Sequence, residues 1–326
     1  MRWGIVGTGG ISRQVVSDFA LVAGAHVSAV ASRDASRAGA FAEEFGIADR
    51  FSDRDAMFRS DIDAVYIGTP HVTHFDIAAS AIQAGRHVLC EKPLGMSGPE
   101  VLELSALASK AGVFLMEAMW MKFNPLYARL AQLIADGVLG EIRSARASFG
   151  AAFPRNDSSR WKPGGSALLD QGIYPVTLAH MLLGRPATIA ADGTARTDGV
   201  DLREHFTLGY SDERFVQGAS SMMEWLDPSA AVCGTDAWVT IDEGFWWASR
   251  LTLHHPLPRG KRRNEVVEVE REGHGYAPML RAVDGAIRAG ALEHPLHSAA
   301  DTADIHETLD EIRRQVVGSH RGARRD

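Results

Sequence analysis

Short apolar runs alternate with longer amphipathic stretches through the first part of the chain. Between the runs, apolar positions recur at helical spacing, and this alternation of runs and stretches is typical of parallel βαβ units. Gly24, Gly46, Gly85 and Gly112 follow the helical stretches, as residues that end helices do. The expected strands are Arg2–Val6, His26–Ala31, Ala64–Ile67, His87–Cys90 and Val113–Met116, and the helical stretches include Ser36–Phe45, Thr73–Ala84 and Pro99–Ala111.

A pattern of alternating apolar and polar residues replaces this one after an expected helix at Pro125–Ala135. Such alternation predicts strands with one buried face, and therefore a largely antiparallel second sheet. Two late helices, Met279–Ala289 and Ala299–Val317, complete the expected elements. The later strands are expected at Ile142–Phe149, Glu204–Gly209, Phe215–Ser221, Ala237–Ile241 and Glu265–Glu270.

The composition is that of an ordinary globular protein. The chain has 326 residues, 34 Lys and Arg against 41 Asp and Glu, a formal net charge of −7 and 45% hydrophobic residues. These values predict two domains and argue against disorder and a nucleic-acid partner. Cys90 and Cys233 form no CxxC or Cys/His cluster, so neither disulfides nor a metal site is expected. The absence of a signal-peptide pattern and of a long apolar run predicts a cytoplasmic location and no membrane partner.

A glycine-rich turn follows the first expected strand. Its sequence is Gly7-Thr8-Gly9-Gly10-Ile11-Ser12, which resembles GxGxxG, and a helical stretch comes next. Gly7 permits a tight turn, Gly9 lets the backbone approach a pyrophosphate, and the helix N-terminus offers N–H groups to it. A turn without a ligand is the alternative, but the strand–turn–helix context favours a dinucleotide site.

The end of the second strand indicates which dinucleotide binds. Strands that select NAD end in an acidic residue that bonds the ribose 2′-OH, whereas this one ends in Ala31-Ser32-Arg33, with Arg37 one turn later. Hydroxyl and guanidinium groups bind a 2′-phosphate, so NADP is expected in preference to NAD. Asp34 could serve the ribose instead, but we expect it to be the N-cap of the next helix.

Titratable residues stand at two further places. The segment EKPL (91–94) follows the fourth expected strand, at the sheet edge where open parallel sheets bind ligands. Within GGSALLDQGIYP (164–175), Asp170 and Tyr174 lie four residues apart and so on one face of an expected helix. The alternatives to catalytic groups here are an exposed loop lysine at Lys92, a surface carboxylate and a core tyrosine.

The sequence resembles the Gfo/Idh/MocA oxidoreductase family in these segments, in MEAMWMKFNP (116–125) and in ARASFG (145–150). With Tyr174 where many members have histidine, it looks like the branch that holds dimeric dihydrodiol dehydrogenase, glucose–fructose oxidoreductase and bacterial xylose dehydrogenases. The resemblance implies an α/β fold, in which residues 1–118 form a Rossmann domain with a doubly wound parallel sheet that binds NADP. Residues 119–326 are then an α+β domain with an open, mainly antiparallel sheet that binds the substrate, and a cleft lies between the two.

The resemblance also implies hydride transfer between nicotinamide and the CH–OH or carbonyl of a sugar, polyol or cyclic vicinal diol. Tyr174 is the candidate for the base that removes the hydroxyl proton, because a nearby Lys92 ammonium lowers the pKa of a phenol. Lys92 would also bond the substrate oxygen, and Asp170 would orient the lysine or a substrate hydroxyl. A non-catalytic NADP-binding sensor or regulatory protein is the alternative, and a methyltransferase, which leaves EKPL unexplained, is a third.

Further residues are assigned from their positions in the family. Trp120 and Phe149 match aromatic positions of the substrate pocket, although aromatic residues also fill cores. His71 and His74 are not expected to bind a metal, since no third ligand is apparent. The cofactor is expected to contact Gly7, Thr8, Gly9, Gly10, Ile11, Ser32, Arg33, Arg37, Thr69, Pro70, His71, His74, Glu91, Lys92 and Trp161.

Three consecutive aromatic residues, Phe245-Trp246-Trp247, are expected on a strand of the second domain. Successive side chains on a strand point to opposite faces, so one face of this segment is left for a subunit interface. Members of the family pair through the open face of the second sheet. A homodimer is therefore expected, with a tetramer as the alternative.

Overall fold

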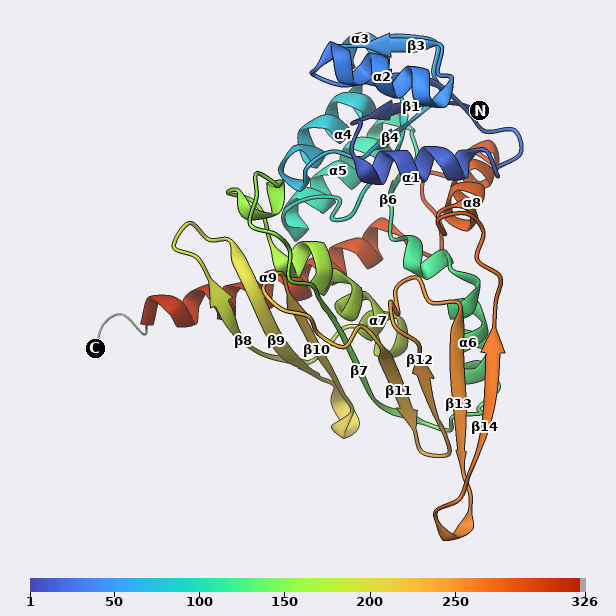
Figure 1. Ribbon diagram of the computed structural model, residues 1–326, viewed down its shortest axis with the longest axis vertical. Helices are drawn as coiled ribbons and strands as arrows, with labels where there is room; N and C mark the ends of the chain where they lie inside the picture. Colours follow the sequence, from blue (N-terminus) through green and yellow to red (C-terminus); the bar gives the residue numbers. More distant parts are fainter. Residues whose placement is uncertain (323–326) are drawn as a thin grey trace. The chain divides into compact units, whose positions relative to one another are not determined.

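The computed structural model describes residues 1–322 of the chain, which form two compact units (Figure 1). The first unit contains Met1–Asn124 and Arg271–Ala303. The second contains Pro125–Glu270 and the C-terminal part of the chain from Asp304. None of the helices within residues 1–322 is sufficiently long and apolar to span a lipid bilayer.

The first unit is built on a six-stranded sheet in which all neighbouring strands run parallel. Its order is β3-β2-β1-β4-β5-β6, so the direction of winding changes between β1 and β4, the point at which such sheets bind ligands. The expected doubly wound parallel sheet is confirmed. Its strands are β1 Arg2–Val6, β2 His26–Ala31, β3 Asp49–Phe51, β4 Ala64–Ile67, β5 His87–Cys90 and β6 Leu115–Glu117.

Helices cover the sheet of the first unit. All residues of β4 are buried, and apolar residues of α4 and α5 belong to the same core as those of β4 and β5, as is typical of parallel sheets with crossover helices. The helices are α1 Gly10–Phe19, α2 Ala35–Phe45, α3 Arg54–Phe58, α4 His74–Gln83, α5 Gly98–Ala111 and α8 Ala277–Arg288, with 3-10 turns at His71–Thr73 and Trp120–Phe123.

The segment Arg271–Ala303 belongs to the first unit, whereas the sequence predicts one second domain from residue 119 to the end. Asp18 of α1 gives the physical reason. Its buried carboxylate accepts hydrogen bonds from the backbone N–H groups of His274 (2.8 Å), Tyr276 (2.7 Å) and Ala277 (3.2 Å). These bonds hold the start of α8 against the end of α1.

The second unit is built on an eight-stranded sheet with the order β14-β13-β12-β11-β7-β10-β9-β8. Only β7 and β10 pair in parallel, so the expected mainly antiparallel sheet is confirmed. The helices are α6 Pro125–Ala135, α7 Ile173–Leu183 and α9 Ala299–Gly322, which begins in the first unit. The strands are β7 Ile142–Gly150, β8 Thr188–Ala195, β9 Asp201–Gly209, β10 Phe215–Ser221, β11 Ala230–Gly234, β12 Trp238–Ile241, β13 Arg250–Pro256 and β14 Arg262–Glu268.

Candidate active site

The glycine-rich turn connects β1 to α1. Gly7 has a φ of 102°, a left-handed value that glycine adopts without strain, and a Cβ there would lie 2.6 Å from the Gly68 carbonyl oxygen. A Cβ at Gly9 or Gly10 would meet no atom within 4 Å. Because α1 begins at Gly10 without a capping side chain or an acidic residue in its first turn, this helix end offers its N–H groups to an anion. The turn therefore fits the pyrophosphate of a dinucleotide.

Asp34, after β2, is the N-cap of α2, as the sequence predicts. Its Oδ1 accepts hydrogen bonds from the backbone N–H groups of Ser36 (2.9 Å) and Arg37 (3.1 Å). Arg33 and Arg37 are exposed, and Ser32 is half-buried. Because the Asp34 carboxylate accepts N–H groups of α2, the groups that suit a 2′-phosphate here are the Ser32 hydroxyl and the guanidinium groups of Arg33 and Arg37.

His74 lies inside the first unit and not at its surface. The ring is fully buried, with Nδ1 2.6 Å from the Pro93 carbonyl oxygen and Nε2 2.8 Å from the Thr69 carbonyl oxygen. Both ring nitrogens therefore contact the backbone of two loops. The expected cofactor contact of His74 stays a prediction, as does that of His71, which lies in the 3-10 turn after Pro70 and is half-buried.

The EKPL segment (91–94) follows β5, and its Lys92–Pro93 peptide bond is cis. Glu91 is buried, and its Oε1 accepts a hydrogen bond from the Tyr66 hydroxyl at 2.8 Å. Burial raises the pKa of Glu91 to about 7, against the lowering effect of the Lys92 charge and the Tyr66 bond. The carboxyl is thus held in the interior, while Lys92 is only half-buried.

Asp170 and Tyr174 stand on adjoining turns of different geometry, which corrects the expectation of one α-helical face. Leu168–Gly172 forms a π-helix, and α7 begins at Ile173, with Tyr174 buried in its first turn. Single π turns are rare and occur often at functional sites. Asp170 Oδ2 accepts a hydrogen bond from Arg160 Nε at 2.6 Å, in an ion pair that the sequence does not predict.

Aromatic rings gather beside Tyr174. Phe149 of β7 lies parallel to Trp246, with ring centroids 3.7 Å apart and an interplanar angle of 11°. The Tyr174 ring centroid is 6.0 Å from that of Phe149 and 5.7 Å from that of Trp246. A flat aromatic surface next to a phenol suits a ring-shaped diol or the apolar face of a sugar.

The triplet that contains Trp246 forms a turn between β12 and β13, which corrects the expectation of a strand with one face at an interface. Phe245 is buried, Trp246 joins the stack and Trp247 is 41% exposed. The Tyr127 hydroxyl of α6 donates to the Phe245 carbonyl oxygen at 2.8 Å, which anchors the turn. Trp246 is the aromatic residue of this site that sequence reasoning did not assign.

The two other candidate tryptophans contact residues of their own units. Trp120 is buried and stacks on Tyr276, with ring centroids 4.4 Å apart, in the first unit. In the second unit, Trp161 closes the 3-10 turn Ser159–Trp161 and donates from Nε1 to the Pro154 carbonyl oxygen at 2.9 Å. Within residues 1–322, His, Cys, Asp and Glu side chains form no group of three that could hold a metal ion.

Sequence comparison identifies relatives along most of the chain. Residues 1–119 match the oxidoreductase family with an NAD-binding Rossmann fold, and residues 127–240 match the Gfo/Idh/MocA C-terminal domain. The trans-1,2-dihydrobenzene-1,2-diol dehydrogenases of Xenopus tropicalis and Mus musculus are each 32% identical to this chain over 97% of its length, and the matches cover 98% and 97% of those proteins.

Solved structures share the fold of the whole chain. KijD10, a 3-ketoreductase from Actinomadura kijaniata in complex with NADP and TDP-benzene, aligns with a TM-score of 0.86 at 28% identity, over 97% of this chain and 98% of that one. An aldose-aldose oxidoreductase from Caulobacter crescentus, complexed with glycerol, aligns with a TM-score of 0.86 at 22% identity over 98% of both chains, which shows the fold alone. With both parts of its fold matched, this chain belongs to the Gfo/Idh/MocA family of oxidoreductases.

Proposed function

We propose that the protein is an NADP-dependent dehydrogenase that oxidises a CH–OH group of a cyclic vicinal diol, sugar or polyol, and reduces the matching carbonyl. The observation that carries this proposal is the placement of the Tyr174 phenol beside the parallel rings of Phe149 and Trp246. A cyclic substrate stacked on such a surface presents its hydroxyl groups at the ring edge, where a phenol can accept a proton. The dihydrodiol dehydrogenases at 32% identity support a diol.

The first unit holds the dinucleotide in this proposal. The turn at Gly7, Gly9 and Gly10 takes the pyrophosphate, while Ser32 and Arg33 take the 2′-phosphate. Thr8, Ile11, Arg37, Thr69, Pro70, His71, His74, Glu91 and Lys92 complete the proposed cofactor contacts of the first unit. Trp161, of the second unit, is a further proposed contact. When bound there, nicotinamide would supply or accept the hydride, and the structure of KijD10, a 3-ketoreductase, in complex with NADP supports this choice of cofactor.

Three residues carry the proton chemistry in this proposal. Tyr174 accepts the hydroxyl proton during oxidation and returns it during reduction. Lys92 bonds the same oxygen, and its ammonium favours the ionised phenol. Asp170, ion-paired with Arg160, orients the neighbouring substrate hydroxyl. Trp120, which belongs to the first unit, remains a proposed aromatic contact of the substrate.

A substrate panel tests the proposal. Reduction of NADP and of NAD is followed with purified protein on trans-dihydrodiols, cyclohexanediols, aldoses, inositols and acyclic polyols. We expect turnover with at least one cyclic substrate and a preference for NADP. NADPH binding without turnover on any compound would contradict the dehydrogenase and favour the non-catalytic sensor. Turnover confined to acyclic polyols would contradict the role of the aromatic surface.

A further inference from the structure

The peptide group between Pro93 and Leu94 is held at both of its polar atoms. His74 Nδ1 lies 2.6 Å from the Pro93 carbonyl oxygen, so this nitrogen is placed to donate its proton there. On the other side of the peptide, the Leu94 N–H donates to Glu117 Oε1 at 2.9 Å. His74 and Glu117 are both fully buried. Because this peptide is the second after Lys92, separated from it only by Pro93, the two side chains restrain the backbone that follows the lysine.

Glu117 uses both of its carboxylate oxygens. It is the last residue of β6, paired in register with Cys90 at the end of β5, and so stands beside the start of the EKPL segment. Oε1 accepts the Leu94 N–H, and Oε2 accepts a hydrogen bond from His297 Nε2 at 2.9 Å. A carboxyl group with 1% exposure requires such partners, because a buried polar group without hydrogen bonds is costly.

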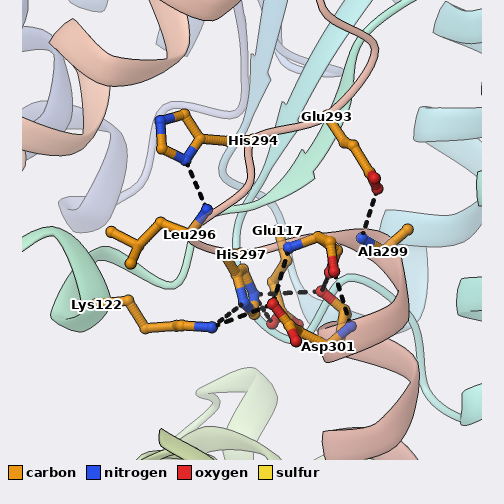
Figure 2. A network of polar contacts seen from close by, with 10 residues as sticks. Glu117, Lys122, Glu293, His294, Leu296, His297, Ala299 and Asp301 are labelled. Carbon is orange, nitrogen blue, oxygen red and sulfur yellow. Dashed lines mark hydrogen bonds and ion pairs between the residues drawn. The ribbon is translucent and has the colours of Figure 1, made fainter.

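His297 connects Glu117 to two further charged residues (Figure 2). Burial lowers the pKa of His297. Because Nε2 faces a carboxyl oxygen and Nδ1 faces an ammonium, Nε2–H donates to Glu117. Its Nδ1 then accepts from the Lys122 ammonium at 3.4 Å, and Lys122 pairs with Asp301 at 3.4 Å. Asp301 also accepts the Ser298 N–H at 3.1 Å, in the first turn of α9. The segment before α9 thereby supports the far side of Glu117.

We propose that Glu117 and His297 are positioning residues for Lys92. Glu117 acts by holding the Leu94 N–H, and His297 acts by orienting and stabilising the Glu117 carboxylate. This inference rests on the proposed function, in which Lys92 bonds the substrate oxygen. A displacement of about 1 Å of a catalytic group costs about a hundredfold in rate, so loss of this support lowers turnover although neither residue touches the substrate.

Two substitutions of Glu117 separate its hydrogen bond with the Leu94 N–H from its contact with His297. Glu117→Ala removes the acceptor of the Leu94 N–H, and we expect kcat to fall about a hundredfold. Glu117→Gln keeps an acceptor for the Leu94 N–H but replaces the second carboxyl oxygen, which accepts from His297, and we expect kcat to fall about tenfold. In both variants KM for NADP stays within about twofold of the wild-type value, since the turn that binds the pyrophosphate is untouched.

Asp284→Asn is the matched control. Asp284 is a buried carboxylate of the same unit, and its bonds go to the Trp3 indole (3.4 Å) and to Arg288 (2.6 Å), both outside the EKPL segment. We expect this variant to lower Tm while kcat stays at the wild-type value. If Asp284→Asn lowers kcat as much as Glu117→Ala does, the effect is general destabilisation and the proposal is overturned.

Hydrogen exchange at the Leu94 amide tests the contact without any substrate. We expect the exchange rate of this amide to rise at least about tenfold in Glu117→Ala and to stay near the wild-type rate in Glu117→Gln. Unchanged exchange in Glu117→Ala, or faster exchange with unchanged kcat, overturns the proposal. If the wild-type protein turns over no compound, the proposed function fails, and the exchange rate alone still decides whether Glu117 holds this peptide.

A second pair of variants covers the case in which Glu117→Ala does not fold. His297→Leu removes the donor to Glu117, and His297→Gln keeps an N–H donor of similar reach. We expect kcat to fall about tenfold in His297→Leu and to recover most of this loss in His297→Gln. Equal kcat values in the two variants overturn the positioning role of His297.

Discussion

The ring centroids of Phe149 and Trp246 lie 3.7 Å apart and the rings are nearly parallel, although one residue lies near the end of a strand and the other in a turn between two later strands. The Tyr174 ring lies within 6.0 Å of both centroids. In the sheet β11 pairs with both β7 and β12, and this order brings the distant segments together. A flat apolar surface is thereby built beside the one phenol assigned to proton transfer.

Truncation of Trp246 tests this surface. Trp246→Ala removes a stacking partner worth about 1 kcal/mol beyond its buried area, so KM for a cyclic substrate rises at least about fivefold, while KM for NADP is unchanged. Steady-state kinetics on the substrate found in the panel measure both constants. Trp247→Ala is the control, because this neighbouring ring is 41% exposed and lies outside the stack. Equal KM values in the two variants would contradict the assignment.

Cofactor selection depends on the residues after β2. Arg33→Ala removes a guanidinium assigned to the 2′-phosphate, so we expect KM for NADP to rise about tenfold or more, with KM for NAD unchanged. Asp34→Ala removes only the cap of α2, which costs about 1 kcal/mol of stability and leaves the NADP preference intact. A variant of Arg33 that still prefers NADP as strongly as the wild type would show that other groups bind the phosphate.

The free energy of unfolding carries a pH dependence from Glu91. Burial raises the pKa of this carboxyl to about 7, from 4.5 in an unfolded chain. Between these values the folded state keeps a proton that the unfolded chain has lost, so stability falls as pH rises from 4.5 to 7, by about 3 kcal/mol at most. Urea unfolding at several pH values measures this slope. Glu91→Gln removes this contribution, and identical slopes in the two proteins would refute it.

The return of the chain to the first unit depends on Asp18. Asp18→Ala leaves three backbone N–H groups without their acceptor, the partly buried one of residue 274 and the buried ones of residues 276 and 277. We expect a loss of about 3 kcal/mol or more in the free energy of unfolding, against about 1 kcal/mol for the exposed cap variant Asp34→Ala. Chemical denaturation compares the two. Similar losses would show that solvent or other groups satisfy these N–H groups.

Much of the fold is predictable from local patterns. β1, β2, β4 and β5 have their predicted bounds, because each is a short apolar run that ends at a polar or glycine-rich segment. β8, β11 and β13 are not predicted, since TIAADGTA, AAVCG and RLTLHHP contain small or polar residues and obtain their strand form from pairing with neighbours.

The candidate site is predictable only where its chemistry is local. The N-cap role of Asp34 depends on residues two and three positions away, and the prediction is confirmed. The pairing of Phe149 with Trp246 depends on sheet order, and the π turn before Tyr174 leaves no mark in the spacing of apolar residues. The two contacts of the His74 ring, with the Thr69 and Pro93 carbonyl oxygens of the loops after β4 and β5, likewise depend on the fold and not on local sequence.

Replacement of the Tyr174 hydroxyl tests the central claim most directly. Tyr174→Phe keeps the ring beside Phe149 and Trp246 and removes only the group assigned to proton transfer. On a substrate identified in the panel, the decisive measurement is kcat together with the Kd for NADPH. The account predicts a fall in kcat of about a hundredfold or more with an unchanged Kd, whereas a kcat near that of the wild-type protein would contradict it.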